Sequence, residues 1–250
     1  MFDAKIGAHL LYEARKTRQA LSALPEEALP RSEAEADLIQ DEVAHMTGPI
    51  RAWKVGAASP TSTPSRAPIH AESLFLNPGR IPASIFTYIG AEAEIAYKFS
   101  KDLTASAALL TLEDVLAAIE SVHPVIEIID SRFYELNSQP PLAHRADQGN
   151  HGALIIGAPI PNWRAMQPQQ QRVILEINGA VASDKIDGNS AGNPEALLLW
   201  LANVGARSLG GIKAGDYVTT GSCSGTILVN APVQLTATLA GRGGVSLRID

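Results

Sequence analysis

The chain has 250 residues, of which 46% are hydrophobic and 18% are charged. This apolar fraction is sufficient for a sizeable core and excludes an intrinsically disordered chain. Acidic residues outnumber basic ones by 26 to 20, which gives a formal net charge of -6 and argues against a nucleic-acid partner.

The first 50 residues predict a helical region. Ser32 and Glu35 form the pattern of a capping box at the start of the second helix, and Gly48 with Pro49 ends it. The apolar positions that follow helical spacing are Ile6, Leu10, Ala14 and Leu21 in the first helix and Ala36, Ile39, Val43 and Met46 in the second.

Beyond Pro49, short runs rich in Val, Ile, Thr and Tyr alternate with Gly, Pro, Asn and Asp, which is typical of many short strands. Asn178 and Gly179 predict a type I′ hairpin, and two helices begin at Thr111 and at the Asn193 cap. The expected strands are 92–99, 125–130, 153–157, 172–177, 216–220, 226–230, 233–239 and 245–249. We therefore expect an α+β chain, with a helical region over 1–50 and a mostly β domain over 51–250.

The single cysteine, Cys223, excludes a disulfide or a thiolate zinc site within the chain. The first residues lack the pattern of a signal peptide, and the longest apolar run, 196–206, is too short to span a bilayer. We expect a soluble, cytoplasmic protein with no membrane partner.

Two glutamates, Glu92 and Glu94, stand two residues apart in an expected strand, so their side chains share one face. Like charges so placed repel unless a hard cation such as Mg²⁺ or Mn²⁺ accepts their oxygens. A solvent-facing edge strand explains the pair equally simply. Glu127 changes the balance, because it lies within an apolar strand where an unpaired charge is costly. From the residues alone, a three-carboxylate metal site and a structural explanation remain evenly matched.

Lys54 follows Trp53 in an apolar context, where partial burial would lower its pKa and suit it to proton transfer. A lysine whose stem lies on the surface is the commoner explanation. The six histidines show no paired metal-ligand spacing, and His151 is left undecided.

Six segments in order resemble the fumarylacetoacetate hydrolase superfamily, in particular its branch of 2-oxopent-4-enoate hydratases and 2-oxo-3-enoate decarboxylases. They are WKVG (53–56), GAEAEIAY (90–97), HPVIEIIDSRF (123–133), ADQGNHG (146–152), GNPEALLLWLAN (192–203) and IKAGDYVTTGS (212–222). The resemblance implies a mixed β-roll and a homo-oligomer built from dimers.

By position, the resemblance implies that Glu92, Glu94 and Glu127 are ligands of Mg²⁺ or Mn²⁺. It also implies catalytic roles for Lys54 and Asp147, and substrate contacts from Asn150, Asn193 and Thr220. The substrate would be a small 2-oxo or 2-hydroxy-dienoate acid, to which water is added as the metal stabilises an enolate.

The chain departs from the branch in three places. Asn193 stands where a histidine is usual, Gln148 and Gly149 interrupt the D-N-x-S segment, and 59–75 lacks the P-D-x-G element. These departures predict a substrate other than the unsubstituted pentadienoate. A decarboxylase, a carbon–carbon hydrolase of acylpyruvates and a non-catalytic accessory subunit remain alternatives to the hydratase.

Overall fold

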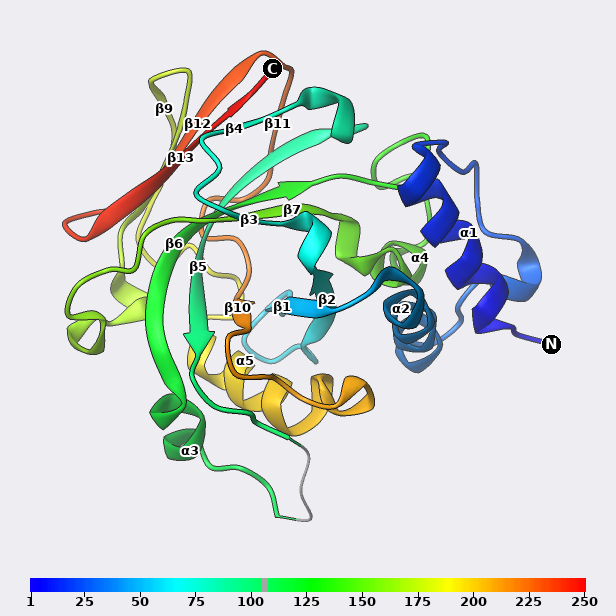
Figure 1. Cartoon of the computed structure of the whole chain (residues 1–250), viewed down its shortest axis with the longest axis horizontal. Coiled ribbons are helices and arrows are strands. Elements are labelled where there is room, and N and C mark those ends of the chain that lie inside the picture. Colours follow the sequence, from blue (N-terminus) through cyan, green and yellow to red (C-terminus); the bar gives the residue numbers. More distant parts are fainter. Residues whose placement is uncertain (105–107) are drawn as a thin grey trace.

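The computed structural model describes residues 1–104 and 108–250. Figure 1 shows the N-terminal helices on one side of a curled, mixed sheet, further helices below it, and a smaller second sheet at the upper left. The α+β architecture expected from the sequence, a helical N-terminus followed by a mixed β-roll, is confirmed.

The N-terminal region holds helix α1 (Ala4–Thr17), a 3-10 turn (Glu26–Ala28) and helix α2 (Glu33–Thr47). Ser32 caps α2 as expected, because its hydroxyl accepts from the Glu35 amide at 3.2 Å. The apolar stripe expected for the first helix is wrong in part. Ala8, Leu11 and Ala14 form its buried face, whereas Ile6 is 38% exposed. The helix ends before Leu21, so the spacing predicted from that residue does not apply.

The larger sheet has eight strands, and its two long central strands, β5 and β6, are antiparallel and buried along almost their whole length. In order across the sheet the strands are β2 (Ser65–His70), β1 (Ile50–Gly56), β10 (Tyr217–Thr219), β5 (Ile89–Phe99), β6 (Ile119–Ile129), β7 (His151–Ile156) and β3 (Leu74–Leu76), while β11 (Ile227–Val229) also pairs with β5. Burial on both faces explains why β6 is a nearly continuous apolar run.

The smaller sheet has five strands, which pair in antiparallel fashion except for one parallel pair at its edge. In order they are β4 (Arg80–Ile81), β13 (Gly243–Ile249), β12 (Val233–Leu239), β8 (Val173–Ile177) and β9 (Ala180–Lys185). Burial alternates along β12, so one face of this sheet covers the core. Asn178 and Gly179 have φ values of 52° and 81°, which confirms the expected hairpin between β8 and β9.

Three further helices pack against the sheets: α3 (Leu112–Ala117), α4 (Pro141–Ala146) and α5 (Pro194–Trp200), which continues as a π-helical turn (Leu201–Gly205). Thr111 and Asp114 form a full capping box on α3, and Asn193 caps α5, as expected. The remaining 3-10 turns are Ala71–Ser73, Ala83–Ile85, Gln148–Asn150, Trp163–Ala165, Pro168–Gln170 and Arg207–Leu209. In the described part of the chain, no helix combines the length and apolarity needed to cross a membrane.

The core lies between the two sheets, and this placement decides where the glutamates point. Ala93 and Ile95 of β5 belong to the same buried cluster as Leu235 of the smaller sheet. Because side chains alternate along a strand, Glu92 and Glu94 face the opposite way, into the hollow of the curled larger sheet. The fold therefore presents acidic side chains inside the roll, away from its main core.

Candidate active site

Three buried glutamates form the centre of the candidate site. Glu92 on β5 is the direct neighbour of Glu127 on β6, and Glu94 follows on the same face of β5. Their exposed fractions are 8% for Glu92, 1% for Glu94 and 0% for Glu127. One carboxylate oxygen from each lies within 4.8 Å of the other two. The structure thus brings together the three residues whose side chains the sequence placed on facing strands.

Hydroxyl and amide donors hold the two glutamates of β5. Thr226 donates to Oε1 of Glu92, and Thr219 donates to Oε2 of Glu94. The backbone N–H of Gly221 also donates to Oε2 of Glu94, at 3.2 Å. These donors come from β10 and from the segment before β11, the two strands that pair with β5. Strand pairing therefore orients both carboxylates.

Two basic side chains hold Glu127. Lys54 Nζ lies 2.6 Å and His151 Nδ1 lies 2.9 Å from its Oε1. Its second oxygen, Oε2, is buried and has no hydrogen-bond partner among the described residues. A buried carboxylate oxygen without a partner is costly unless something else binds it.

The electrostatics of the triad show the same deficit of positive charge. Burial, and then repulsion from Glu127 and Glu92, raises the pKa of Glu94 well above its ordinary value. Burial and the charge of Glu127 raise the pKa of Glu92 as well. Burial would raise the pKa of Glu127 too, but the Lys54 ammonium and His151 outweigh it and lower that pKa. One lysine therefore compensates one of three neighbouring carboxylates.

This donor set fits a hard divalent cation. The possible ligand atoms that converge here among the described residues are three carboxylate oxygens, and Mg²⁺ or Mn²⁺ binds such oxygens at about 2.0–2.2 Å. The free Oε2 of Glu127 provides a ligand atom that no protein group uses. The triad could hold such an ion and would gain the charge compensation that it otherwise lacks.

Lys54 lies at the edge of the triad because β1 pairs in parallel with β10, where Lys54 is the neighbour of Thr219. Its Nζ also donates to the Gly149 carbonyl at 3.1 Å. Burial would lower the pKa of Lys54, but the carboxylates of Glu127 and Glu92 outweigh burial and raise it. The side chain is 19% exposed, so its ammonium can reach a bound molecule.

A cavity of about 740 Å³ opens onto the three glutamates and Lys54. Its apolar lining consists mainly of Ile129, Leu136, Leu142 and Leu228. Besides Lys54, two cationic side chains line it, and both are already paired: Arg66 with Asp41, and Arg145 with Asp37 at 2.8 Å and with Glu33 at 3.2 Å. Among the described lining residues, then, every cation has a carboxylate partner.

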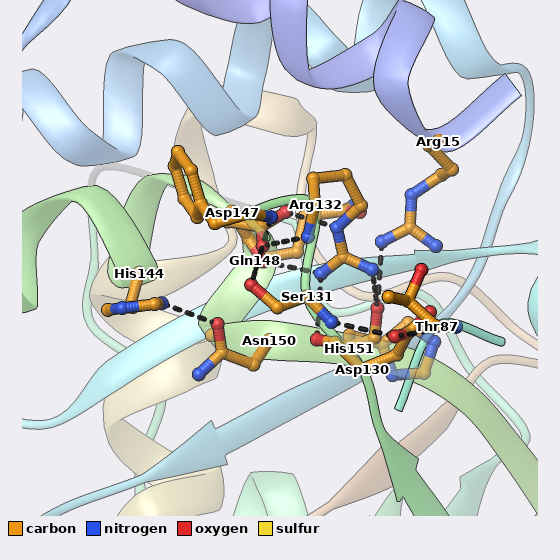
Figure 2. A network of polar contacts seen from close by, with 12 residues as sticks. Arg15, Thr87, Asp130, Ser131, Arg132, His144, Asp147, Gln148, Asn150 and His151 are labelled. Carbon is orange, nitrogen blue, oxygen red and sulfur yellow. Dashed lines mark hydrogen bonds and ion pairs between the residues drawn. The ribbon is translucent and has the colours of Figure 1, made fainter. Parts of the chain in front are cut away.

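The other residues singled out from the sequence lie in different places. Asn150 lines the cavity and its Oδ1 is 2.8 Å from His144 Nδ1. Asp147 does not line it: both of its carboxylate oxygens accept from Arg132, as Figure 2 shows. Thr220 is buried behind Gly221, with its hydroxyl 3.5 Å from the Ile95 carbonyl. Asn193 accepts from the Glu195 amide at 3.0 Å and is occupied as a helix cap outside the cavity lining.

Three residues whose side chains contact the triad were not predicted as site residues: Thr219, Thr226 and His151. His151 lies in the ADQGNHG segment and Thr219 directly precedes the predicted Thr220, so each had a signal nearby. Thr226 follows the Gly-rich segment 221–225 and had no comparable signal.

Comparison with known proteins gives a family match over most of the chain. Residues 49–245 match the family described as "Fumarylacetoacetate (FAA) hydrolase C-terminal". A 2-hydroxyhexa-2,4-dienoate hydratase of Comamonas testosteroni is 30% identical over 161 residues, which are 63% of this chain and 59% of that protein. A 4-oxalocrotonate decarboxylase of Pseudomonas putida is 30% identical over 135 residues, or 54% of this chain and 51% of that protein. The chain spans a little over half the length of these curated relatives.

A solved structure shares the fold over nearly the whole chain. The 4-oxalocrotonate decarboxylase from Pseudomonas putida G7, complexed with magnesium and adipate, superposes with a TM-score of 0.87 and 24% identity. The superposition covers 99% of this chain and 97% of that one. The helical N-terminus thus belongs to the shared fold, together with the β-roll.

Proposed function

Because the chain belongs to the fumarylacetoacetate hydrolase C-terminal family, we propose that it is a metal-dependent hydratase of a small 2-hydroxy-dienoate or 2-oxo-alkenoate acid. The observation that carries the proposal is the buried triad, whose free Glu127 Oε2 faces no protein donor while Lys54 stands beside it. Curated relatives named as hydratases support the reaction class.

Glu92, Glu94 and Glu127 would hold the Mg²⁺ or Mn²⁺ ion. When bound, the ion supplies a positive charge that fixes the carboxylate and 2-oxygen of the substrate and favours its enolate form. Thr219 and Thr226 keep the ligand oxygens of Glu94 and Glu92 in place through their hydroxyls. These contacts prepare the carboxylates before the substrate arrives.

Lys54 is the group that we assign to proton transfer. Hydration of a 2-hydroxy-dienoate places the hydroxyl of water on C4, while the remaining proton of water and the proton of the 2-hydroxyl end on C3 and C5 as the 2-oxygen becomes a carbonyl. The reaction therefore needs proton transfer but no oxidant or reductant. The Lys54 ammonium holds a proton next to the cavity and is steadied by Glu127 and the Gly149 carbonyl. A positioned acid–base group of this kind contributes about 10²–10⁴-fold to the rate.

The cavity favours a monocarboxylate over the diacid that a 4-oxalocrotonate decarboxylase accepts. A second carboxylate at the far end of a substrate needs a cation, and Arg145 is already bound by Asp37 and Glu33. The apolar lining of Ile129, Leu136, Leu142 and Leu228 instead suits an alkyl or alkenyl tail. An acylpyruvate hydrolase is less well supported, because His151 is 1% exposed and bound to Glu127 and Ser73, which leaves it unable to activate water.

The test combines metal binding with turnover. We expect calorimetry to give one Mg²⁺ or Mn²⁺ per chain, and the metal-loaded protein to consume 2-hydroxyhexa-2,4-dienoate and to release a 4-hydroxy-2-oxo acid. Glu94→Gln should lose both properties, whereas Glu113→Gln, on the exposed first turn of α3, should keep both. Metal binding without turnover of any 2-oxo acid would instead identify an accessory subunit.

A further inference from the structure

A second cavity, of about 340 Å³, lies between helix α1 and the loop that follows β6, and none of the three glutamates lines it. Arg15, Lys16 and Arg18 of the α1 end line one side, and Arg132, Glu72 and Phe75 contribute to the rest. Figure 2 shows Arg15 reaching from the helix toward the His151 carbonyl and Arg132.

The two buried charged groups at the base of this cavity, Arg132 and Asp130, already have hydrogen-bond partners within the chain. Arg132 is 5% exposed and donates to both oxygens of Asp147 through its Nε and backbone N–H, and to the His151 carbonyl at 2.8 Å. One oxygen of Asp130 accepts three backbone N–H groups, those of Thr87, Tyr88 and Ser131. Asp147 therefore neutralises Arg132, whereas Asp130 keeps its negative charge because its partners are neutral amides.

Arg15 differs from the nearby Arg132 in its partners. Its Nη2 donates to the His151 carbonyl at 2.8 Å, and no carboxylate of the described residues lies within 4.0 Å of its guanidinium. Burial, followed by the positive charge of Arg132, lowers the pKa of Arg15. A partly buried guanidinium with unused donors is unfavourable unless an anion accepts from it.

The mouth of the cavity adds positive charge. Lys16 and Arg18 are exposed and form no ion pair with another described residue. Glu72 and Asp130 are the acids that offset Arg15, Lys16 and Arg18, so the cavity keeps an excess of one positive charge. An anion with a small apolar body would meet Phe75 and Ile85 on the wall.

We propose that this cavity is a binding site for a small oxyanion, a carboxylate or phosphate group, held by the Arg15 guanidinium with Lys16 and Arg18 at its mouth. A guanidinium binds either group through two parallel N–H donors. The cavity volume suits a ligand of metabolite size. The proposal does not rest on the hydratase reaction, since this cavity shares no lining residue with the cavity at the triad.

The test is titration of the full, Mg²⁺-loaded chain with two probes, inorganic phosphate and butyrate, at constant ionic strength. We expect saturable binding of at least one probe by calorimetry, and its identity distinguishes a phosphate site from a carboxylate site. Arg15→Gln should weaken that binding at least tenfold. The matched control is Arg164→Gln, because Arg164 lies over Trp163 and outside this cavity, and it should leave the affinity unchanged.

Arg15→Lys keeps the charge but removes the two-donor geometry, so we expect it to bind more weakly than the wild type and more tightly than Arg15→Gln. This variant also serves if the glutamine variant folds poorly. Absence of saturable binding of both probes to the wild type, or equal affinities in the wild type and the Arg15 variants, overturns the proposal.

Discussion

His151 Nδ1 lies 2.9 Å from Oε1 of Glu127, and each side chain is 1% exposed. The other imidazole nitrogen lies 3.1 Å from the Ser73 hydroxyl, so the ring is fixed at both ends. Because Oε1 of Glu127 is also bound by Lys54, the carboxylate cannot rotate freely, and Oε2 remains as the atom available to a metal. His151 therefore positions Glu127, a proposed metal ligand, without lining the cavity at the triad.

Removing this contact should weaken metal binding. We expect His151→Ala to lower the affinity for Mg²⁺ or Mn²⁺ by about 10–100-fold, because outer partners that orient a ligand have effects of this size. Calorimetry measures the change directly. The control is His45→Ala, an exposed histidine in the last turn of α2, which should bind metal like the wild type. Equal affinities in both variants would show that Glu127 does not need His151.

Lys54→Ala separates proton transfer from metal binding. We expect kcat to fall by about 10²–10⁴-fold while the metal remains bound, since we assign Lys54 to proton transfer and not to metal coordination. Steady-state kinetics on the preferred dienoate, together with a metal titration of the same sample, provides the measurement. Lys98→Ala removes an exposed lysine paired with Glu120 and should change neither quantity. An unchanged kcat would reduce Lys54 to a structural role.

Strand alternation predicts only part of the triad from the residues alone, and the resemblance implied the set of three glutamates, because the meeting of Glu92 with Glu127 depends on the pairing of β5 with β6. Glu92 and Glu94 share a face whatever the strand pairs with, and Glu127 is conspicuous within an apolar run. The supporting hydroxyls could not be predicted in this way. Thr219 and Thr226 reach the triad because β10 and β11 pair with opposite ends of β5, which no local pattern specifies.

Some strands and some side-chain contacts were not predicted from the sequence, again for physical reasons. Strands β1, β2, β3 and β4 were not predicted. Strands β3 and β4 are only three and two residues long, and Pro68 interrupts the pattern of β2. Asp147 was predicted as a catalytic residue, but it lies outside the cavity lining and both of its oxygens accept from Arg132, fifteen residues earlier in the chain. Side-chain partners of this kind are set by tertiary packing.

Asp216 makes stability depend on pH. It is 1% exposed, and burial raises its pKa to about 6. A raised carboxyl pKa means that the folded chain holds the proton more tightly than the unfolded chain. The associated stability is fully present below about pH 4 and is lost as the pH rises through about 6.

Asp216→Asn should remove this loss of folding stability at higher pH. The variant keeps an oxygen to accept from the Lys213 amide, so we expect it to be more stable than the wild type by about 2–3 kcal/mol at pH 7.5. The difference should shrink toward zero near pH 4. Urea unfolding of both proteins at the two pH values measures it, with Asp187→Asn on an exposed turn as the control. A difference that does not vary with pH would contradict the assignment to Asp216.

The choice between monocarboxylate and diacid can be reversed with one substitution in the cavity lining. Leu136 belongs to the apolar lining, and Arg145 nearby in the chain is occupied by Asp37 and Glu33. Leu136→Arg would supply an unpaired guanidinium for the second carboxylate of a diacid. A hydrogen bond to a charged group contributes about 1.5–3 kcal/mol, which corresponds to roughly 10–100-fold in relative kcat/KM.

We therefore expect the wild type to prefer 2-hydroxyhexa-2,4-dienoate to a 2-oxo diacid of equal chain length, and Leu136→Arg to shift the ratio of the two kcat/KM values about 10–100-fold toward the diacid. Leu76→Arg is the matched control, because Leu76 is 65% exposed at the end of β3 and does not line the cavity. Steady-state kinetics on both acids with all three proteins provides the ratios. If the wild type turns over the diacid as efficiently as the dienoate, the paired state of Arg145 does not restrict the substrate. If the wild type prefers the dienoate but Leu136→Arg leaves the ratio of the two kcat/KM values unchanged, the far end of the substrate does not lie against Leu136. The tail must then contact another part of the apolar lining.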